Sequence, residues 1–473
     1  MFIGREQELS RLESIWAKEG VRGCSVMGRR QIGKSSLLDV FSVGKHAFTI
    51  QFNRGSPGDN LTYFNERVAS FLGREIPKKD TLTELFLLLV EGCRDQPTLI
   101  VLDEFPYLAE DYPQASSVLQ RFIDRDIKGM DVMVVICGSS IRMMKSLVED
   151  MDSPLYGRIG YRIHVGPLSF EECSKFHPNM ERIDALKLYM TIGGVPKYHY
   201  LVSGHTYKEC ICDLFLDREV MSQEGAMIIT QELSPGSRYL NMVRHISNGA
   251  VKQNQIAEKM GMDRGNCKRY LDNLEQIEII SKIHPMLNAP EKPHYTISDP
   301  VVDFYFSIVV KWESAIRRKL GPDTIYKLVE HDIDTFLGKR FEFFCGEWLD
   351  RVMAVRERGT WWGRVDDVDT DIDIVADVIT PDLYTHPLLA ECKFRKSKMG
   401  FSVYNDLVRR GEAARVGYNV RYMLISISGF DGKLEEFAED NGVILIGPEE
   451  LIGDGLSLEG WVRDAMVQLG MRT

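Results

Sequence analysis

The sequence predicts an α/β protein in which a parallel sheet with covering helices comes first and helical and mixed units follow. Over the first 165 residues, short β-rich runs alternate with helical stretches, which is the pattern of a parallel sheet covered by helices. Several of these runs are almost wholly apolar, as strands buried on both faces must be. The expected strands are residues 23–27, 47–52, 98–102, 132–137 and 161–165.

Length and composition limit what the chain can be. Its 473 residues are enough for three or four compact units, and 44% hydrophobic with 27% charged residues is ordinary for a globular protein. No apolar run approaches the roughly 18 residues of a membrane span, and the first residues lack the pattern of a secretory signal. The nine cysteines are scattered, with one close pair at Cys210 and Cys212. This usage suits a reducing compartment, so we expect a cytoplasmic protein without a membrane partner.

Residues 28–35 match the phosphate-binding pattern G-x-x-x-x-G-K-[ST], with a β-rich run before them and an amphipathic stretch after them. The glycines let backbone N–H groups surround a phosphate, Lys34 reaches the β- and γ-phosphate oxygens for binding and catalysis, and Ser35 ligates Mg²⁺. We therefore expect ATP and Mg²⁺ to bind here. The predicted nucleotide-binding residues of this segment are Gly28, Arg29, Arg30, Gln31, Ile32, Gly33, Lys34, Ser35 and Ser36.

The third expected strand ends in two acids, Asp103 and Glu104. An apolar strand in this position delivers Asp103 to the Mg²⁺ shell and leaves Glu104 to orient or deprotonate the attacking water. A phosphate loop, its strand–loop–helix context and this acid pair coincide, so the sequence predicts an ATP-hydrolysing enzyme.

Three further positions have two interpretations each. Ser139 and Ser140 end the fourth strand, where a polar side chain either senses the γ-phosphate or forms a turn. Arg158 either stabilises charge on the transferring phosphate as an arginine finger or is a surface residue. Pro196 either covers the nucleotide from a helical lid or ends a helix.

Taken in order, these motifs resemble the archaeal-type ATPase family, which is related to the STAND signalling ATPases and, more distantly, to the origin-recognition ATPases of the AAA+ class. The resemblance extends over nearly the whole chain. It implies that Gly4 and Arg5 lie near the adenine and that a nuclease-like domain ends the chain. Besides the phosphate loop, the segments that carry it are Phe2-Ile3-Gly4-Arg5-Glu6-Gln7-Glu8, Asp103-Glu104, Gly138-Ser139-Ser140 and Gly193-Gly194-Val195-Pro196.

The rest of the chain divides where the pattern changes. Ser169-x-x-Glu172 reads as a capping box that opens a helix, and Ser234-Pro235-Gly236 reads as a boundary. The predicted domains are a P-loop ATPase domain at 1–168, a helical lid at 169–233, a winged helix at 234–300, a helical connector at 301–334 and a nuclease-like domain at 335–473.

Residues 253–260 and 264–279 are short amphipathic stretches around a turn, which are the proportions of a helix-turn-helix, and 295–297 resembles the wing of a winged helix. The second helix of such a motif enters the major groove of DNA. Because the net charge of −11 opposes nucleic-acid binding by the whole chain, binding needs a local basic face. The module can instead serve only for packing or protein contact. The predicted DNA-binding residues are Arg264, Asn266, Lys268 and Arg269.

Acidic residues and a lysine come together in the last unit. Asp373 lies on one β-like run, and Glu391 and Lys393 share a face of the next because strand side chains alternate. Glu342 can lean in from the preceding helix. Phosphodiester hydrolysis needs metal ligands and catalytic groups. Here the Mg²⁺ ligands would be Asp373 and Glu391, and the catalytic groups would be Lys393 and Glu342. The pattern resembles the PD-(D/E)XK nuclease fold, some members of which keep the fold and lose the activity.

Two neighbouring features have plainer readings. Asp367, Asp369 and Asp371 alternate, but the segment lacks the central glycine and final glutamate of an EF-hand, so we expect a solvated acidic strand face. Trp361 and Trp362 either stack on bases or close a hydrophobic core.

Together these features predict a multidomain ATPase that binds ATP and Mg²⁺ and acts on DNA, with ATP controlling the nuclease-like domain. The alternatives are a STAND-like regulatory switch whose carboxy-terminal domain binds without cutting, and a loader that acts on DNA with a protein partner. The predicted partners are nucleotide and DNA, with a second copy of the chain or a partner protein left open.

Overall fold

The computed structural model describes residues 2–55, 57–216, 221–287, 292–318, 320–379, 384–417 and 419–453. They group into two compact units, the first made of Met1–Phe176 with Gly194–Leu201 and the second of His177–Gly193 with Val202–Thr473. The segment expected as a helical lid is thus shared between the units. In these ranges no helix combines the length and apolar character needed to cross a membrane, and the nine cysteines are all buried.

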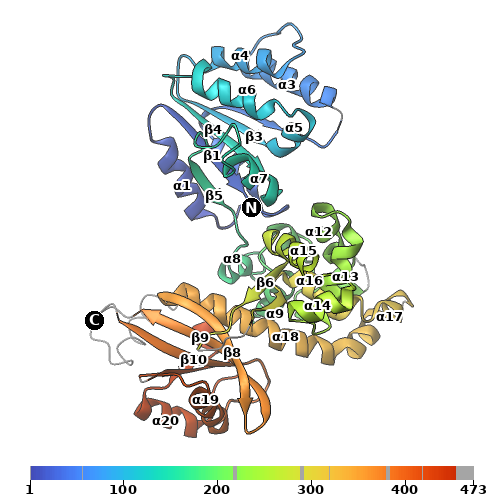
Figure 1. Cartoon of the computed structure of the whole chain (residues 1–473), viewed down its shortest axis with the longest axis vertical. Helices are drawn as coiled ribbons and strands as arrows, with labels where there is room; N and C mark the ends of the chain where they lie inside the picture. Colours follow the sequence, from blue (N-terminus) through green and yellow to red (C-terminus); the bar gives the residue numbers. More distant parts are fainter. Residues whose placement is uncertain are drawn as a thin grey trace. The chain divides into compact units, whose positions relative to one another are not determined.

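The first unit is built on a five-stranded parallel sheet in the order β2-β3-β4-β1-β5 (Figure 1). Every residue of β3 and β4 is buried, which requires cover on both faces of the sheet. The predicted parallel α/β fold is confirmed, and each strand lies within two residues of its expected position. The strands are β1 (Val21–Met27), β2 (His46–Gln51), β3 (Thr98–Asp103), β4 (Val132–Gly138) and β5 (Tyr161–His164).

Helices cover this sheet, and α3, α4 and α6 lie together over one face of it (Figure 1). α8 begins with the predicted capping box, which is confirmed: the N–H of Glu172 donates to Ser169 Oγ at 3.3 Å, and the N–H of Ser169 donates to Glu172 Oε2 at 2.7 Å. The helices are α1 (Glu6–Trp16), α2 (Lys34–Ser42), α3 (Pro57–Leu72), α4 (Leu82–Gly92), α5 (Phe105–Asp111), α6 (Ala115–Arg121), α7 (Ile141–Val148), α8 (Phe170–Ser174) and α10 (Pro196–Tyr200).

The second unit begins with short helices. α14 and α15 flank a turn in which Gly261 has φ 59°, a left-handed conformation that glycine adopts without strain. Strands β6 (Ile280–Ile283) and β7 (His294–Ile297) follow and pair antiparallel, and they share a hydrophobic core with α13, α14 and α15. The helices are α9 (Arg182–Ile192), α11 (Tyr207–Ile211), α12 (Glu224–Glu232), α13 (Gly236–Ser247), α14 (Gln253–Met260), α15 (Arg264–Gln276), α16 (Pro300–Phe304) and α17 (Glu313–Arg317), with π-helical turns at Phe122–Asp126 in the first unit and at Cys212–Leu216 and Tyr305–Val309 in this one.

A long helix, α18 (Pro322–Val352), leads into a second five-stranded sheet in the order β12-β11-β10-β9-β8. The expected connector and last domain share this helix, because the division between residues 334 and 335 falls inside it. The pairs β8–β9 and β9–β10 are antiparallel, and β10–β11 and β11–β12 are parallel. The remaining elements are β8 (Val355–Val365), β9 (Val368–Ile379), β10 (Thr385–Lys393), α19 (Phe401–Ala413), β11 (Arg421–Ser426), α20 (Gly432–Asn441), β12 (Ile444–Ile446) and α21 (Pro448–Ile452).

Strand β8 was not predicted, because its sequence is charged, glycine-containing and mostly solvent-accessible. Trp361 and Trp362 lie on this strand, not in a loop. Trp361 is buried in the core with Ile372 and Leu424, as the plainer reading expected. Asp367 and Asp369 are exposed at the start of β9, which confirms the expected acidic surface.

Candidate functional site

The phosphate-loop segment, residues 28–35, connects β1 to the first turn of α2. Gly33 has φ 94°, and a Cβ atom on Gly28 would lie 2.3 Å from the carbonyl oxygen of Val165. Both positions therefore require glycine. Because α2 begins at Lys34, the N–H groups of its first turn, which lack partners within the helix, lie at the loop.

Lys34 is held inside the loop. Its side chain is 5% exposed, and its Nζ donates hydrogen bonds to the carbonyl oxygens of Gly28 and Arg29, both at 2.8 Å. An ammonium group in this position can exchange these carbonyl oxygens for phosphate oxygens without a large movement.

The two acids after β3 meet residues of other motifs. Ser35 Oγ donates to Asp103 Oδ2 at 2.7 Å, which joins α2 to the end of β3. Glu104 has φ 52°, a left-handed conformation that is uncommon for a residue with a side chain and often marks functional positions. Its Oε2 accepts hydrogen bonds from the Ser139 N–H at 3.1 Å and from Ser139 Oγ at 3.0 Å. The phosphate loop, the acid pair after β3 and the end of β4 therefore lie close together.

A tyrosine that the sequence reading missed also lies here. The guanidinium of Arg30 donates to the Tyr107 hydroxyl, which is 3.5 Å from Ser139 Oγ, and the guanidinium of Arg54 lies 4.8 Å from the centre of the Tyr107 ring. Tyr107 follows Glu104 by three residues at the start of α5, so the spacing places both on one side of the helix. That spacing was the available signal.

The amino-terminal segment packs beside the loop. The guanidinium of Arg5 donates to the Ile32 carbonyl oxygen at 2.9 Å and pairs with Glu8 at 3.0 Å. A Cβ atom on Gly4 would lie 2.2 Å from Glu172 Oε1. The expected place of Gly4 and Arg5 near the adenine stays a prediction, and their position against the loop is compatible with it.

Pro196 is the first residue of α10 and also lies near the loop. A Cβ atom on Gly33 would be 3.9 Å from the Pro196 ring. Gly194, two residues earlier, accepts a hydrogen bond from the Leu168 N–H at 2.8 Å, and a Cβ atom there would lie 2.0 Å from the Leu168 oxygen. This close backbone approach ties the segment before Pro196 to the first unit. Pro196 begins helix α10 and does not end one, and its covering of a nucleotide stays a prediction.

Arg158 is not brought to the loop. Its Nε donates to both carboxylate oxygens of Asp124, at 3.0 and 2.9 Å. Its carbonyl oxygen would be 2.2 Å from a Cβ on Gly23, which lies toward the start of β1, whereas the loop follows the end of that strand. The expectation of an arginine finger acting within the same chain is therefore corrected: Arg158 is a partly exposed, ion-paired residue.

The second candidate site lies in the carboxy-terminal sheet. Lys393 Nζ is 2.6 Å from Glu391 Oε1 and 3.7 Å from Asp373 Oδ2. The other contact of Asp373 Oδ2 is the Cys392 N–H, which donates to it at 2.8 Å across the β9–β10 pair. The Glu391 and Asp373 side chains are 5% and 7% exposed. The three residues predicted from strand periodicity are thus brought together.

Glu342 comes from α18 and completes this group, which we call the acid cluster: Glu342, Asp373, Glu391 and Lys393. Burial, and then the charges of Asp373 and Asp371, raise the pKa of Glu342 to about 8. Burial, and then the charge of Glu391, raise the pKa of Asp373 to about 7. Burial opposes the charged form of Lys393, but Asp373 and Glu391 outweigh it and raise its pKa. Burial is therefore the main reason that Glu342 and Asp373 hold protons more strongly than ordinary carboxyl groups.

Arg410 was not predicted for this site. Its Nη2 is 2.9 Å from Glu391 Oε2, its Nη1 donates to the Asp371 carbonyl oxygen at 2.6 Å, and its Nε donates to the Asp406 carbonyl oxygen at 3.1 Å. The sequence offered one signal for this residue: Arg410 follows Leu407 by three positions, which places it on the buried side of α19.

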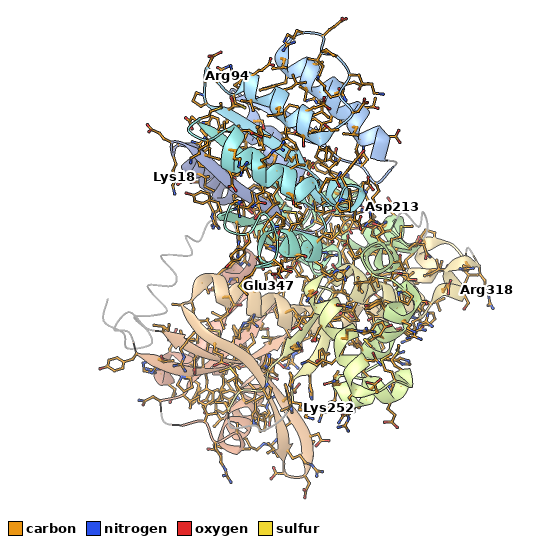
Figure 2. The ribbon with its side chains drawn as sticks, turned by 45° about the horizontal axis from the view of Figure 1, so that its top comes forward. Lys18, Arg94, Asp213, Lys252, Arg318 and Glu347 are labelled. Atoms are coloured by element: carbon orange, nitrogen blue, oxygen red, sulfur yellow. The ribbon has the colours of Figure 1, made fainter. Side chains whose placement is uncertain are left out.

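A cavity of about 410 Å³ is lined by two members of the acid cluster, Glu342 and Asp373, and a second of about 370 Å³ shares these two residues. Both include Glu342, Asp373, Thr360 and Ile283, so strand β6 forms one wall of each. Glu347, labelled in Figure 2, comes from the same helix as Glu342 and lines the second cavity.

The residues predicted to contact DNA lie at the exposed first turns of α15, and one of them, Asn266, takes part in the helix cap. Its N–H and its side-chain amide both donate to the carboxylate of Asp263, the former at 2.9 Å. Arg264, Lys268 and Arg269 are exposed. Lys252, at the exposed start of α14, is labelled in Figure 2.

Two acids further along α15 pair with strand β6. Lys282 of β6 contacts the carboxylates of Asp272, at 3.5 Å, and Glu275. The first turns of α15 thus present Arg264, Lys268 and Arg269 beside the cap residue Asp263.

Comparison with known proteins agrees with this architecture. The family described as an ATPase domain predominantly from Archaea matches residues 2–202, and a family of archaeal and bacterial proteins of unknown function matches residues 305–403. Over 468 residues the chain is 25% identical to the uncharacterized protein MJECL04 of Methanocaldococcus jannaschii, covering 95% of this chain and all of that one.

Two further similarities are partial. Over 87 residues, the chain is 33% identical to the uncharacterized protein MJ0424 of the same organism, covering 18% of this chain and 84% of the relative. The Walker-type ATPase PABY2304 of Pyrococcus abyssi overlaps with a TM-score of 0.49 at 18% identity, over 64% of this chain and 96% of that one. The chain belongs to the family of ATPases found predominantly in Archaea.

Proposed function

We propose that the phosphate loop and the end of β3 bind ATP with Mg²⁺ and carry the hydrolysis. The observation that supports this assignment most directly is the convergence of Lys34, the Ser35–Asp103 pair and Glu104 at one end of the parallel sheet. The residues fit the metal, because the Ser35 hydroxyl and the Asp103 carboxylate are the oxygen donors that Mg²⁺ prefers. When bound, Mg²⁺ neutralises charge on the phosphates.

The chain's own residues have separate roles in this proposal. Lys34 holds the β- and γ-phosphate oxygens and stabilises the charge that builds up on them. Glu104 orients the attacking water and accepts its proton, while Ser139, which donates two hydrogen bonds to Glu104, fixes the direction of that carboxylate. Ser139 is a positioning residue in this scheme.

Phosphate release from ATP by the purified chain, with Mg²⁺ and with EDTA, tests this assignment. Turnover that survives EDTA, or that is unchanged in Lys34→Ala, would refute it.

We further propose that the carboxy-terminal unit hydrolyses DNA phosphodiesters under the control of the ATPase, with the exposed first turns of α15 as a duplex contact of winged-helix type. The contacts of Lys393 with Asp373 and Glu391, beside a cavity lined by Asp373 and Glu342, support this function best. Among the described residues no three His, Cys, Asp or Glu side chains are already arranged around a metal position, so the proposal assigns two ligands, Asp373 and Glu391.

These two residues fit a divalent cation by their chemistry. Both offer carboxylate oxygens, and burial, followed by the charge of Glu391, holds the pKa of Asp373 well above its usual range, a penalty that a cation would reduce. A bound Mg²⁺ would supply positive charge to the scissile phosphate. Lys393 would stabilise and place the attacking water, and Glu342, with a pKa of about 8, can take up and return a proton near neutral pH.

Cleavage of plasmid and oligonucleotide DNA with Mg²⁺ or Mn²⁺, with and without ATP, tests the nuclease proposal. Cleavage should disappear in Lys393→Ala and persist in Lys396→Ala, a matched loss of an exposed lysine three residues away. A change in cleavage in Lys34→Ala then reports the coupling to ATP. No cleavage with either metal would reject the nuclease.

A second function is favoured by one observation. Both oxygens of Glu391 already face cations, Lys393 on one side and Arg410 on the other. Such pairing suits a domain that binds without cutting, as in a STAND-like regulatory switch. That function predicts ATP-dependent self-association, visible in light scattering. It also predicts that Asp373→Ala keeps the activity of the protein, which is opposite to the nuclease expectation.

A further inference from the structure

The hairpin of β6 and β7 continues into an edge contact with β8, beside the acid cluster. The Met286 N–H donates to the Thr360 carbonyl oxygen at 3.0 Å, and the Thr360 N–H donates to the His284 carbonyl oxygen at 3.4 Å. A Cβ atom on Gly359 would lie 2.4 Å from that same His284 oxygen. The backbones approach so closely that only glycine fits, and the hairpin is built into the cavity wall.

Two flat rings line the 410 Å³ cavity at this junction. His294 of β7 stacks on Trp362 of β8, with ring centres 3.9 Å apart and planes 9° apart. The hydroxyl-bearing Thr360 and Thr370 line the same cavity, as does Asp373 of the acid cluster. A third flat ring that enters the cavity can extend the stack while the attached sugar and phosphate lie beside hydroxyl groups and carboxylates.

The carboxylate of Asp373 is recessed in this cavity. Asp373 lines the cavity, and its side-chain exposure of 7% places it below the surface, beyond reach of a phosphate on the outside of a double helix. A strand separated from its complement can enter, since the cavity has the size of small-ligand sites, roughly 300–1,000 Å³. Enzymes that act on a recessed nucleotide generally need it unpaired.

We propose that the cavity between the β6–β7 hairpin and strands β8 and β9 takes a single nucleic-acid strand, with His294 and Trp362 as the platform on which one base stacks. This inference rests on the proposed action on DNA and narrows its substrate to unpaired strands or strand ends. The hairpin then has a defined role, because it forms the wall that excludes duplex. Because the cavity is acidic, the phosphate needs a divalent cation beside it.

Binding, measured apart from cleavage, tests this inference. A fluorescein-labelled oligothymidine and the duplex it forms with oligoadenosine are titrated with the full chain, followed by anisotropy, in Ca²⁺, which takes the same oxygen ligands as Mg²⁺. All proteins carry Lys268→Ala and Arg269→Ala, which removes the proposed duplex contact on α15. The single strand should bind more tightly than the duplex, and Trp362→Ala should weaken it roughly 5- to 100-fold, the range of one base–aromatic stack.

The conservative Trp362→Phe should restore most of the affinity, which separates stacking from a fold defect. Gly359→Ala, which pushes the hairpin from β8, should reduce the preference for the single strand, whereas Gly432→Ala, whose Cβ would meet nothing within 4 Å, should leave it unchanged. Equal affinity for strand and duplex, or no effect of Trp362→Ala, overturns the inference.

Tighter binding of both DNA forms in Gly359→Ala also overturns it and makes the hairpin an inhibitory lid. Strand binding without any cleavage removes the nuclease and leaves this inference standing. Cleavage of duplex DNA without binding of the single strand would support the nuclease and overturn this inference.

Discussion

The two carboxylate sites of this chain differ in what surrounds the acids. At the end of β3, Asp103 and Glu104 each face neutral donors, the hydroxyl of Ser35 and the N–H and hydroxyl of Ser139. In the carboxy-terminal sheet, Glu391 faces two cations, and Asp373 shares its surroundings with other carboxylates. The carboxylates after β3 therefore keep negative charge that a ligand can neutralise. In the carboxy-terminal sheet, the lysine and the arginine already neutralise part of the negative charge of the carboxylates.

That difference separates the sites in function as well. A site whose acids accept hydrogen bonds from neutral donors gains charge balance from the arriving Mg²⁺–nucleotide. Carboxylates that are paired with a lysine and an arginine can stay buried without a bound ligand. The existence of such a site is therefore weaker evidence for catalysis. The following changes test how far the contrast holds, from the largest expected effect to the smallest.

Replacing Glu104 by Gln should have the largest effect, because it removes the proton acceptor while keeping the size and hydrogen-bonding capacity of the side chain. We expect ATP turnover to fall by roughly 10²- to 10⁴-fold, the usual contribution of a general base. Nucleotide affinity, measured by calorimetry, should stay near that of the wild type. Turnover within a few-fold of the wild type would exclude Glu104 as the base.

Lys34→Ala should reduce turnover by roughly 10²- to 10³-fold, as expected for loss of a preorganised charge that stabilises the transition state. Nucleotide binding should weaken too, since Lys34 contacts the ground state. Lys145→Ala is the matched control, because that lysine is exposed on α7 in the same unit. Equal effects of the two changes would mean that the role of Lys34 was misassigned.

Arg410→Ala tests the cationic side of the contrast. The Arg410–Glu391 pair is about nine-tenths buried, and loss of one partner of a buried pair costs about 3–5 kcal/mol. Arg409 next to it is 57% exposed and pairs with exposed acids, so Arg409→Ala should cost only about 0–1 kcal/mol. Denaturant unfolding monitored in the full chain should show this difference, and equal midpoints would contradict the assigned role.

Asp373→Asn should have the smallest effect, and its sign depends on pH. The pKa of Asp373 is about 7 in the folded chain against an ordinary 3.8, so its ionisation lowers stability progressively as pH rises between these values. Asparagine can still accept the Cys392 N–H. In EDTA, the change should therefore raise the unfolding temperature more at pH 8 than at pH 5, and a pH-independent difference would argue against this linkage.

The first site could be predicted almost completely because its chemistry is contiguous in sequence. The loop, its strand and helix, and the acids after β3 follow from local patterns, and the capping box at Ser169 was equally readable. The contact of Tyr107 with Ser139 was missed, although the three-residue spacing from Glu104 places Tyr107 beside the acid pair. Arg158 precedes β5, and the start of that parallel strand lies at the opposite edge of the sheet from the loop after β1, so its surface position follows from the predicted topology.

All four residues of the acid cluster were predicted, but Arg410 beside it was not. Period-two spacing places Glu391 and Lys393 on one face, but Arg410 comes from a helix whose register against β10 is set by packing. Strand β8 escaped prediction because it is an exposed edge-side strand whose charged sequence lacks apolar alternation. The docked hairpin and the His294–Trp362 stack depend on tertiary contact alone.

The unbroken helix α18 has a mechanical consequence. Its 31 residues make a rod of roughly 46 Å at 1.5 Å per residue, and Glu342 lies in its second half. A rigid rod behaves as a lever, so a tilt imposed near Pro322 reaches Glu342 as a displacement that grows with distance from the pivot. The angle of one helix can thus set whether its carboxylate meets Asp373 and Lys393.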